Sequence, residues 1–152
     1  MSRAVVALAG NPNTGKTSLF NALTGSRQKV GNWPGVTVER KDGVMQAEGR
    51  ALEMVDLPGS YSLCASSPDE AVVIETLLGI GQERRPDMIL CVVDSTALVR
   101  SLFIAAQMAD LGLPMVIALN MWDEAREKGL AFDHVELSHR LGVPCIPVSA
   151  KT

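Results

Sequence analysis

The chain has 152 residues, enough for one domain with a sizeable core. Apolar residues make up 47% and charged residues 20%, which is ordinary for a soluble globular protein. The net charge of −3 gives no general attraction to nucleic acid, so we expect no nucleic-acid partner. The cysteines form no C-x-x-C pair, which indicates reduced thiols in a cytosolic domain. No apolar run reaches the roughly 20 residues of a membrane helix, so the sequence predicts a soluble chain.

Short apolar runs alternate with helical patterns, which is typical of buried parallel strands connected by helices. In chain order, the sequence predicts a strand at 4–9, a helix at 17–23, a loop at 26–37, a hairpin of strands at 38–47 and 50–57, a helix starting after Ser67, a strand at 88–93, a helix at 97–111, a strand at 115–119, a helix at 133–141 and a strand at 143–148. Cys91 lies within an apolar run and is expected in the core.

This order of elements predicts an α/β fold with a doubly wound, mostly parallel sheet. We expect six strands, one antiparallel edge strand, and helices on both faces. Ligands of such sheets bind beyond the carboxyl ends of the strands, so the residues that directly follow each strand are the candidates for a site.

The segment after the first strand, Gly10 to Thr17, reads GNPNTGKT and matches the phosphate loop G-x-x-x-x-G-K-[ST] between a strand and a helix. Backbone N–H groups of such a loop point at phosphate oxygens, and the helix N-terminus adds partial positive charge. Lys16 would contact the β- and γ-phosphates, and the Thr17 hydroxyl would bind Mg²⁺. The expected nucleotide contacts of this segment are Asn11, Pro12, Asn13, Thr14, Gly15, Lys16, Thr17 and Ser18.

The hairpin's second strand is followed by the sequence DLPG, which runs from Asp56 to Gly59. Asp56 is placed to hold Mg²⁺ through a water molecule. The Gly59 N–H can approach the γ-phosphate, because no side chain blocks it.

Two further polar segments follow later strands: NMWD, which begins at Asn120, and SAK, which begins at Ser149. The Asp123 carboxylate could accept two hydrogen bonds from the N1–H and 2-amino groups of guanine, and adenine would leave it unpaired. Asn120 would brace the loops and Met121 would cover the base. In the last segment (Ser149, Ala150, Lys151), the Ala150 N–H would donate to guanine O6.

Together these four segments resemble the site of a Ras-like P-loop GTPase, and the match spans nearly the whole chain. Such an enzyme also needs a switch I threonine before the second strand, and Thr37 is the candidate. Its hydroxyl would bind Mg²⁺ only when the γ-phosphate is present.

Four stretches, GNPNTGKT, VGNWPGVTVE, DLPGSYSL and NMWD, resemble the N-terminal G domain of FeoB, the bacterial ferrous iron transport family. The resemblance implies that residues 1–152 are a GTP-binding domain cut just after SAK, without its final helix, so apolar surface beside the last strand is expected to be partly uncovered. It also implies a parent protein on the cytoplasmic face of the inner membrane, with a helical regulatory domain and a membrane domain as partners of this one. Whether the parent is a homo-oligomer is left open.

The FeoB family belongs to the Era/MnmE-like branch, in which some members use a bound K⁺. The resemblance assigns this ion to Asn13, with the backbone carbonyls of Gly31 and Trp33 completing its site. A cation between the β- and γ-phosphates would oppose developing negative charge. The expected catalytic residues are therefore Lys16, Thr37, Gly59 and Asn13. Trp33 is expected to contribute its carbonyl more than its indole, and to need no burial.

Ser60 stands where Ras-like enzymes commonly have a glutamine that orients the attacking water, so we expect slow hydrolysis. Arg27 and Arg40 flank switch I and are expected to be solvated. The leading hypothesis is a regulatory, slowly hydrolysing GTPase domain of a ferrous iron transporter, with Mg²⁺ and K⁺ as cofactors. The alternatives are an Era-like GTPase in ribosome or tRNA maturation, or a non-hydrolysing nucleotide-dependent interaction module.

Overall fold

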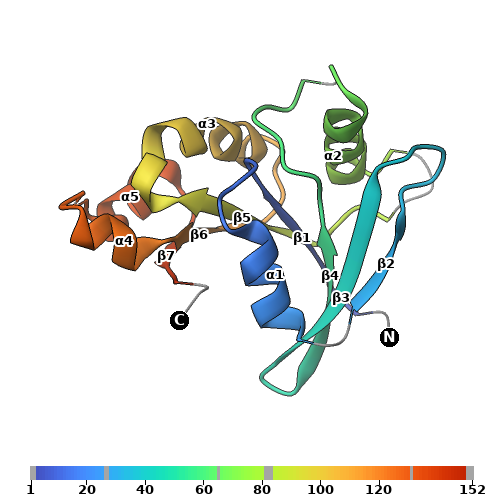
Figure 1. Ribbon diagram of the computed structural model, residues 1–152, viewed down its shortest axis with the longest axis horizontal. Coiled ribbons are helices and arrows are strands. Elements are labelled where there is room, and N and C mark those ends of the chain that lie inside the picture. Colours follow the sequence, from blue (N-terminus) through green and yellow to red (C-terminus); the bar gives the residue numbers. More distant parts are fainter. Residues whose placement is uncertain (1–2, 26–27, 65, 81–83, 131, 150–152) are drawn as a thin grey trace.

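The computed structural model describes residues 3–25, 28–64, 66–80, 84–130 and 132–149. Its elements are β1 (Val5–Gly10), α1 (Lys16–Thr24), β2 (Gln28–Asn32), β3 (Glu39–Ala47), β4 (Arg50–Asp56), α2 (Pro68–Leu78), β5 (Met88–Asp94), the 3-10 turn η1 (Ser95–Ala97), α3 (Leu98–Ala109), β6 (Met115–Asn120), α4 (Trp122–Glu127), α5 (His134–Leu141) and β7 (Cys145–Pro147). Figure 1 shows their arrangement.

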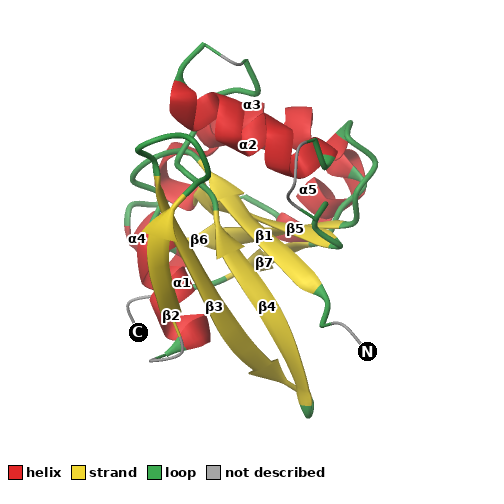
Figure 2. Ribbon diagram, turned by 90° about the vertical axis from the view of Figure 1, so that its right-hand side faces the viewer, coloured by secondary structure: helices red, strands yellow, loops and turns green. Residues whose placement is uncertain are grey.

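The described strands form one sheet in the order β2-β3-β4-β1-β5-β6-β7. The five strands from β4 to β7 in this order run parallel to one another. Helix α1 lies on one face, and α2 and α3 lie on the other (Figures 1 and 2). The predicted α/β fold with helices on both faces is confirmed.

Strand β1 shows why both faces need a helical cover. Ala7 and Ala9 belong to the core cluster on the side of α2 and α3, whereas Val6 and Leu8 belong to the cluster on the side of α1. Because alternate side chains of a strand point to opposite faces, a continuous apolar run is buried only between two layers. Phe20 of α1 is completely buried against the second cluster.

The prediction of a loop over residues 26–37 is wrong for β2, which makes a seventh strand and forms the edge of the sheet. Strand β3 is antiparallel to both β2 and β4, so the antiparallel strand lies one position inside the edge. The sequence of β2, QKVGN, has one large apolar residue, Val30, which is exposed. This segment is therefore a strand because its backbone pairs with β3, and its sequence has no hydrophobic alternation that would have predicted it.

The predicted hairpin at Glu48 and Gly49 is confirmed. Ala47 pairs with Arg50 across the turn, and both turn residues have positive φ, 51° and 78°. That backbone is the two-residue turn whose twist matches antiparallel strands. Helix α4 was not predicted, because its six residues are too few to show helical periodicity.

Gly43 of β3 positions α1 against the sheet. A side-chain carbon at this residue would lie 2.5 Å from Thr24 Cγ2 and 3.1 Å from Phe20 Cζ. The absence of a side chain therefore lets α1 lie directly on β3, and this packing fixes the helix whose first turn belongs to the phosphate loop.

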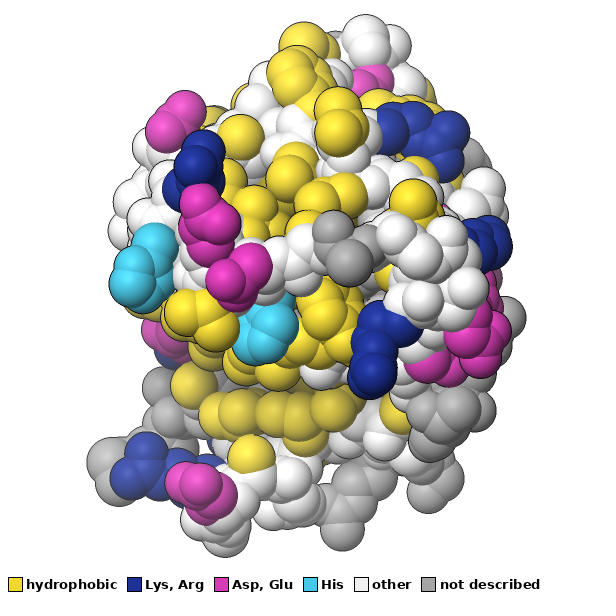
Figure 3. All heavy atoms as spheres, turned by 90° about the vertical axis from the view of Figure 1, so that its left-hand side faces the viewer, with side chains coloured by type: hydrophobic (Ala, Val, Ile, Leu, Met, Phe, Trp, Pro, Cys, Tyr) yellow, Lys and Arg dark blue, Asp and Glu magenta, His cyan; other side chains and the backbone are white. Residues whose placement is uncertain are grey.

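The face formed by α3, α4, α5 and β7 carries apolar side chains at the surface (Figure 3). Val99, Phe103, Val135 and Ile146 are all at least half exposed. Of these residues, Ile146 belongs to β7, the last strand of the sheet. Among the described helices, none is long and apolar enough to cross a membrane.

Cys91 of β5 is fully buried, as expected. Burial, with a smaller contribution from negative charge at Cys145, raises the pKa of the Cys91 thiol to about 12. The ordinary pKa of a thiol in an unfolded chain is near 9.0, so the folded protein holds this proton more tightly.

This raised pKa predicts a loss of stability in alkali. The stabilisation is complete below pH 9 and is lost as the pH rises toward 12, because the unfolded chain releases the proton first. Between these limits, the contribution of Cys91 to the free energy of unfolding should fall by about 1.4 kcal/mol per pH unit. Urea unfolding at pH 8 and pH 10 checks this prediction. Cys91→Ala should show a smaller pH-dependent loss than the parent, and equal losses would contradict it.

Candidate nucleotide-binding site

The predicted phosphate loop connects β1 to α1 at the carboxyl end of the sheet. Asn13 and Gly15 have positive φ, 66° and 82°, which curls the loop around the start of the helix. Thr14 is buried, and its hydroxyl donates to the Asn11 carbonyl at 3.0 Å. Asn13 is exposed. This backbone shape is the one that turns successive N–H groups toward a bound anion.

Lys16 and Asp56 form an ion pair at the end of two neighbouring parallel strands. Their side chains are 10% and 9% exposed, respectively. Together with Thr17 they line a pocket of about 230 Å³, whose other lining residues are Val38, Glu39, Lys41, Leu57, Pro58 and Asp69. The structure thus brings together three of the residues predicted to hold phosphate and Mg²⁺.

The polar groups of this pocket suit a phosphate with a bound magnesium ion. Mg²⁺ prefers oxygen ligands and is usually held by one or two protein oxygens together with phosphates and water. The Thr17 hydroxyl and the Asp56 carboxylate supply such oxygens, and Lys16 supplies the cation for phosphate. Among the described residues, no cluster of three or more His, Cys, Asp or Glu side chains is arranged to hold a metal.

The DLPG segment lies directly on the phosphate loop. A side-chain carbon at Gly59 would come within 3.0 Å of the Pro12 backbone, and the Ser60 N–H donates to the Gly10 carbonyl at 3.0 Å. The Ser60 hydroxyl donates to the Ser62 carbonyl at 2.6 Å and is buried. That hydroxyl is therefore engaged within its own loop rather than pointing at the phosphate pocket.

The start of α2 holds the segment after DLPG. Glu70 accepts hydrogen bonds from the hydroxyls of Ser62, Ser66 and Ser67, while its N–H donates to Ser67 Oγ, the predicted helix cap. The hydrogen bond from Ser66 is the main reason that the pKa of Glu70 lies below its usual value. The Glu70 carboxylate is a contact that sequence reasoning missed, although its spacing from Ser67 is that of a capping box.

The predicted base-recognition residues also meet. Ser149 donates from its hydroxyl to Asp123 Oδ1 at 2.8 Å, and Asn120 Nδ2 donates to the Thr14 carbonyl at 3.0 Å. A small pocket of about 70 Å³ lies between them, lined by Gly15, Ser18, Asn120, Met121, Asp123, Glu124 and Ser149. Glu124 was not predicted, although it directly follows Asp123. Ala150 and Lys151 lie outside the described residues.

Switch I meets the phosphate pocket through Val38 rather than through Thr37. Thr37 is exposed and does not line the pocket of Lys16 and Asp56, although its neighbour Val38 does. Gly31 lies within β2, opposite Arg40 of β3. The structure therefore does not gather Asn13, Gly31 and Trp33, and their shared role in K⁺ binding stays a prediction.

Two expectations for switch I are corrected. Trp33, expected to need no burial, is 3% exposed and belongs to the core cluster on the α2 side of the sheet. Arg40, expected to be solvated, donates to Asp42 at 2.9 Å and lies 4.4 Å above the centre of the Trp33 ring. The sequence did not show this, because the contact depends on how β2 and β3 pair. Arg27 lies outside the described residues.

The fold and this site define the class: a phosphate-loop α/β domain of the G-domain type. The family model described as Ferrous iron transport protein B matches residues 4–152. The chain belongs to this FeoB family.

Relatives and solved structures agree with the family match. The Fe(2+) transporter FeoB of Escherichia coli K12 is 44% identical over 152 residues, and the FeoA–FeoB fusion protein of Porphyromonas gingivalis is 48% identical over 147 residues. Both matches cover 97% of this chain but only 19% and 17%, respectively, of those proteins. The chain thus spans about a fifth of the length of these curated relatives.

The structural matches are equally broad. A mutant S. thermophilus NFeoB bound to mGDP superposes with a TM-score of 0.92 at 49% identity, covering 99% of this chain and 56% of that one. The cytosolic domain of T. maritima FeoB in its GMPPNP form gives a TM-score of 0.92 at 43% identity, covering 98% of this chain and 57% of that one. These neighbours confirm the fold.

Contact between Gly15 and Asn120 predicts a specific effect on stability. In Gly15→Ala, the new methyl group would overlap Asn120 Nδ2 and break its hydrogen bond to Thr14, in addition to straining a residue with φ of 82°. Gly112 has the same φ, but a methyl group added there would meet no atom within 4 Å, so Gly112→Ala measures the backbone strain alone. Gly15→Ala should lower the free energy of unfolding by about 1–3 kcal/mol more than Gly112→Ala. Denaturant unfolding compares them, and equal losses would show that the Asn120 bond contributes nothing.

Proposed function

We propose that this chain binds GTP with Mg²⁺ and hydrolyses it slowly, as the regulatory domain of a ferrous iron transporter. The observation that carries the proposal is the meeting of two sites at one end of the sheet: the Lys16–Asp56 pocket and the pocket beside Asp123. The relatives described as bound to GDP, mGDP or GMPPNP support guanine nucleotide as the ligand.

The Asp123 carboxylate carries the proposed preference for guanine. Its Oδ1 accepts a hydrogen bond from the Ser149 hydroxyl, which orients the carboxylate. The N1–H and 2-amino groups of guanine are the donors that would complete its hydrogen bonding. Adenine offers no matching donors, so it would cover part of the carboxylate without completing its hydrogen bonds. Asn120 acts indirectly by holding the phosphate loop through the Thr14 carbonyl.

Lys16 and Asp56 would exchange partners when nucleotide binds. In the described conformation they neutralise one another within a largely buried pocket. A β- or γ-phosphate would draw the Lys16 ammonium, leaving the Asp56 carboxylate to hold a metal-bound water while Thr17 supplies a direct ligand. Bound Mg²⁺ would neutralise negative charge on the phosphates. The Gly59 N–H would approach the γ-phosphate from the loop that packs on Pro12.

Slow hydrolysis follows in this proposal from the lack of a side chain to orient water. Ser60 follows Gly59, and its hydroxyl is already engaged with the Ser62 carbonyl. A bound K⁺ near Asn13 would oppose the developing charge, and Thr37 would complete the magnesium site once switch I closes. The engaged Ser60 also favours a second candidate function, a nucleotide-dependent interaction module without hydrolysis.

The larger biological setting is also part of the proposal. The relatives are named as Fe(2+) transporters, and this chain matches only their G-domain portion. We propose that this domain works at the cytoplasmic face of the inner membrane, attached to helical and transmembrane domains of the same parent chain. GTP hydrolysis would then regulate ferrous iron uptake through switch I and through switch II, the segment that begins at DLPG.

A nucleotide titration tests guanine recognition. With Mg²⁺ present, calorimetry should show GTP binding at least about a hundredfold more tightly than ATP, because adenine has no donors to offer the Asp123 carboxylate. Asp123→Ala should remove most of this difference, whereas Glu127→Ala, an exposed acid on the same helix, should keep it. Equal affinity of the parent chain for GTP and ATP would overturn the proposed function.

The rate of phosphate release from GTP, measured in KCl and in NaCl, tests the proposed role of K⁺. The parent should turn over GTP several times faster in KCl, and Asn13→Ala should lose this acceleration while still binding GDP. Asn21→Ala removes an exposed asparagine of α1 outside the phosphate loop and serves as the control. Absence of turnover in both salts would support the non-hydrolysing module, and equal turnover would contradict a role for K⁺.

A further inference from the structure

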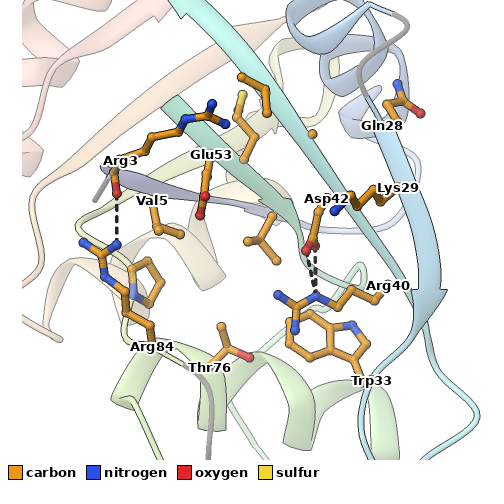
Figure 4. Close-up of a pocket in the computed structure, with 15 residues that line it drawn as sticks. Arg3, Val5, Gln28, Lys29, Trp33, Arg40, Asp42, Glu53, Thr76 and Arg84 are labelled. Atoms are coloured by element: carbon orange, nitrogen blue, oxygen red, sulfur yellow. Dashed lines mark hydrogen bonds and ion pairs between the residues drawn. The ribbon is translucent and has the colours of Figure 1, made fainter. Parts of the chain in front are cut away.

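The indole of Trp33 occupies a defined position between the edge strands and α2. It packs in the core cluster that includes Val55 and Val72, and Arg40 lies across its ring (Figure 4). Arg40 Nε donates to both Asp42 oxygens, at 2.9 and 3.2 Å, which holds the guanidinium above the indole. A cation held over an aromatic face adds a favourable electrostatic contact to the burial of the ring.

The buried indole restrains the backbone of switch I. The Trp33 N–H donates to the Val38 carbonyl at 2.9 Å, and the Trp33 carbonyl accepts from the Val36 N–H at 3.3 Å. Thr37 is exposed within this closed turn, and upstream β2 is paired with β3. While Trp33 stays in place, its carbonyl is engaged and Thr37 remains away from the pocket of Lys16 and Asp56.

One feature of the indole opposes its burial. Trp33 Nε1 is buried and finds no hydrogen-bond partner among the described residues. Water would satisfy this donor if the ring moved outward, whereas packing and the Arg40 contact favour the inward position. These opposing terms reduce the free-energy difference between the inward and outward positions of the ring, which is what a switch requires.

Open space adjoins the buried ring. Trp33, Arg40, Asp42, Thr76 and Arg84 contribute to the lining of a pocket of about 560 Å³ below the edge strands (Figure 4). The indole therefore has packed core on one side and a cavity on another, so it can leave without unfolding the core around it.

We propose that the Trp33 indole, clamped by the Arg40–Asp42 pair, holds Thr37 of switch I away from the pocket of Lys16 and Asp56 and leaves its site when Thr37 moves to the nucleotide. Trp33 and Arg40 are then positioning residues that set the balance between the withdrawn and closed forms of switch I. This inference rests on the proposed function, because it takes GTP as the ligand and Thr37 as the residue that follows it. Release of the anchor would also free the Trp33 carbonyl from Val36.

Tryptophan fluorescence tests the movement directly. In Trp122→Phe, Trp33 is the single remaining tryptophan. Without nucleotide and with GDP, its emission should be blue-shifted and weakly quenched by acrylamide. With GMPPNP, Mg²⁺ and KCl, the emission should shift to the red and the quenching constant should rise several-fold. A shielded Trp33 in the presence of bound GMPPNP, with binding measured separately by equilibrium dialysis, would overturn the anchor while leaving the proposed function intact.

The Arg40 clamp is tested without nucleotide. Arg40→Met keeps the apolar stem but removes the charge, so the exposed fraction of Trp33 should rise about twofold to fivefold, and GMPPNP affinity should increase in parallel. Arg40→Lys retains a cation and should restore most of the parent behaviour. Arg140→Ala, a control in α5 that removes an arginine 76% exposed, should match the parent. Unchanged shielding in a folded Arg40→Met protein would refute the clamp, whereas failure of the parent chain to bind guanine nucleotide would refute the proposed function instead.

Discussion

Direct backbone contact around the phosphate loop is the constraint on which the rest of this structure depends. The loop between β1 and α1 is held from one side by the DLPG segment, where Gly59 packs on Pro12 and Ser60 donates to Gly10. From the other side, the Asn120 amide donates to Thr14. A larger residue at position 59 or at position 15 would push these segments apart. The phosphate loop therefore contacts both the DLPG segment at the phosphate end of the site and Asn120 at the base end.

Charge balance explains how this crowded end of the sheet is stable without ligand. The ammonium of Lys16 and the carboxylate of Asp56 are both largely buried, and each would be costly to bury alone. Pairing them lets each charge offset the other. The same two side chains would bind a magnesium–phosphate group. On ligand binding, the ion pair would be replaced by a contact of Lys16 with phosphate and a contact of Asp56 with a metal-bound water.

Switch I is held in a different way from the phosphate loop. It is fixed by the pairing of β2 with β3 and by the Trp33 indole, which packs in the core cluster on the α2 side of the sheet. Strand β2 has little apolar side chain to bury, so its pairing with β3 rests on backbone hydrogen bonds, supplemented by one anchored ring. An edge strand that buries so little apolar side chain can change partners at a smaller cost in free energy than the parallel strands of the core.

The sequence by itself determined the parallel core of the sheet, the hairpin turn and the polar segments that follow the strands and meet at one end of the sheet. Each of these depends on local chemistry: a continuous apolar run such as that of β1, a turn with two positive-φ residues, or a motif at the end of a strand. It did not reveal β2, the burial of Trp33 or the stacking of Arg40. Those features arise from pairing between segments, and QKVGN carries no periodicity from which to infer a strand. Only the tertiary structure decided them, because the partner of an edge strand and the cover of an aromatic ring are supplied by residues elsewhere in the fold.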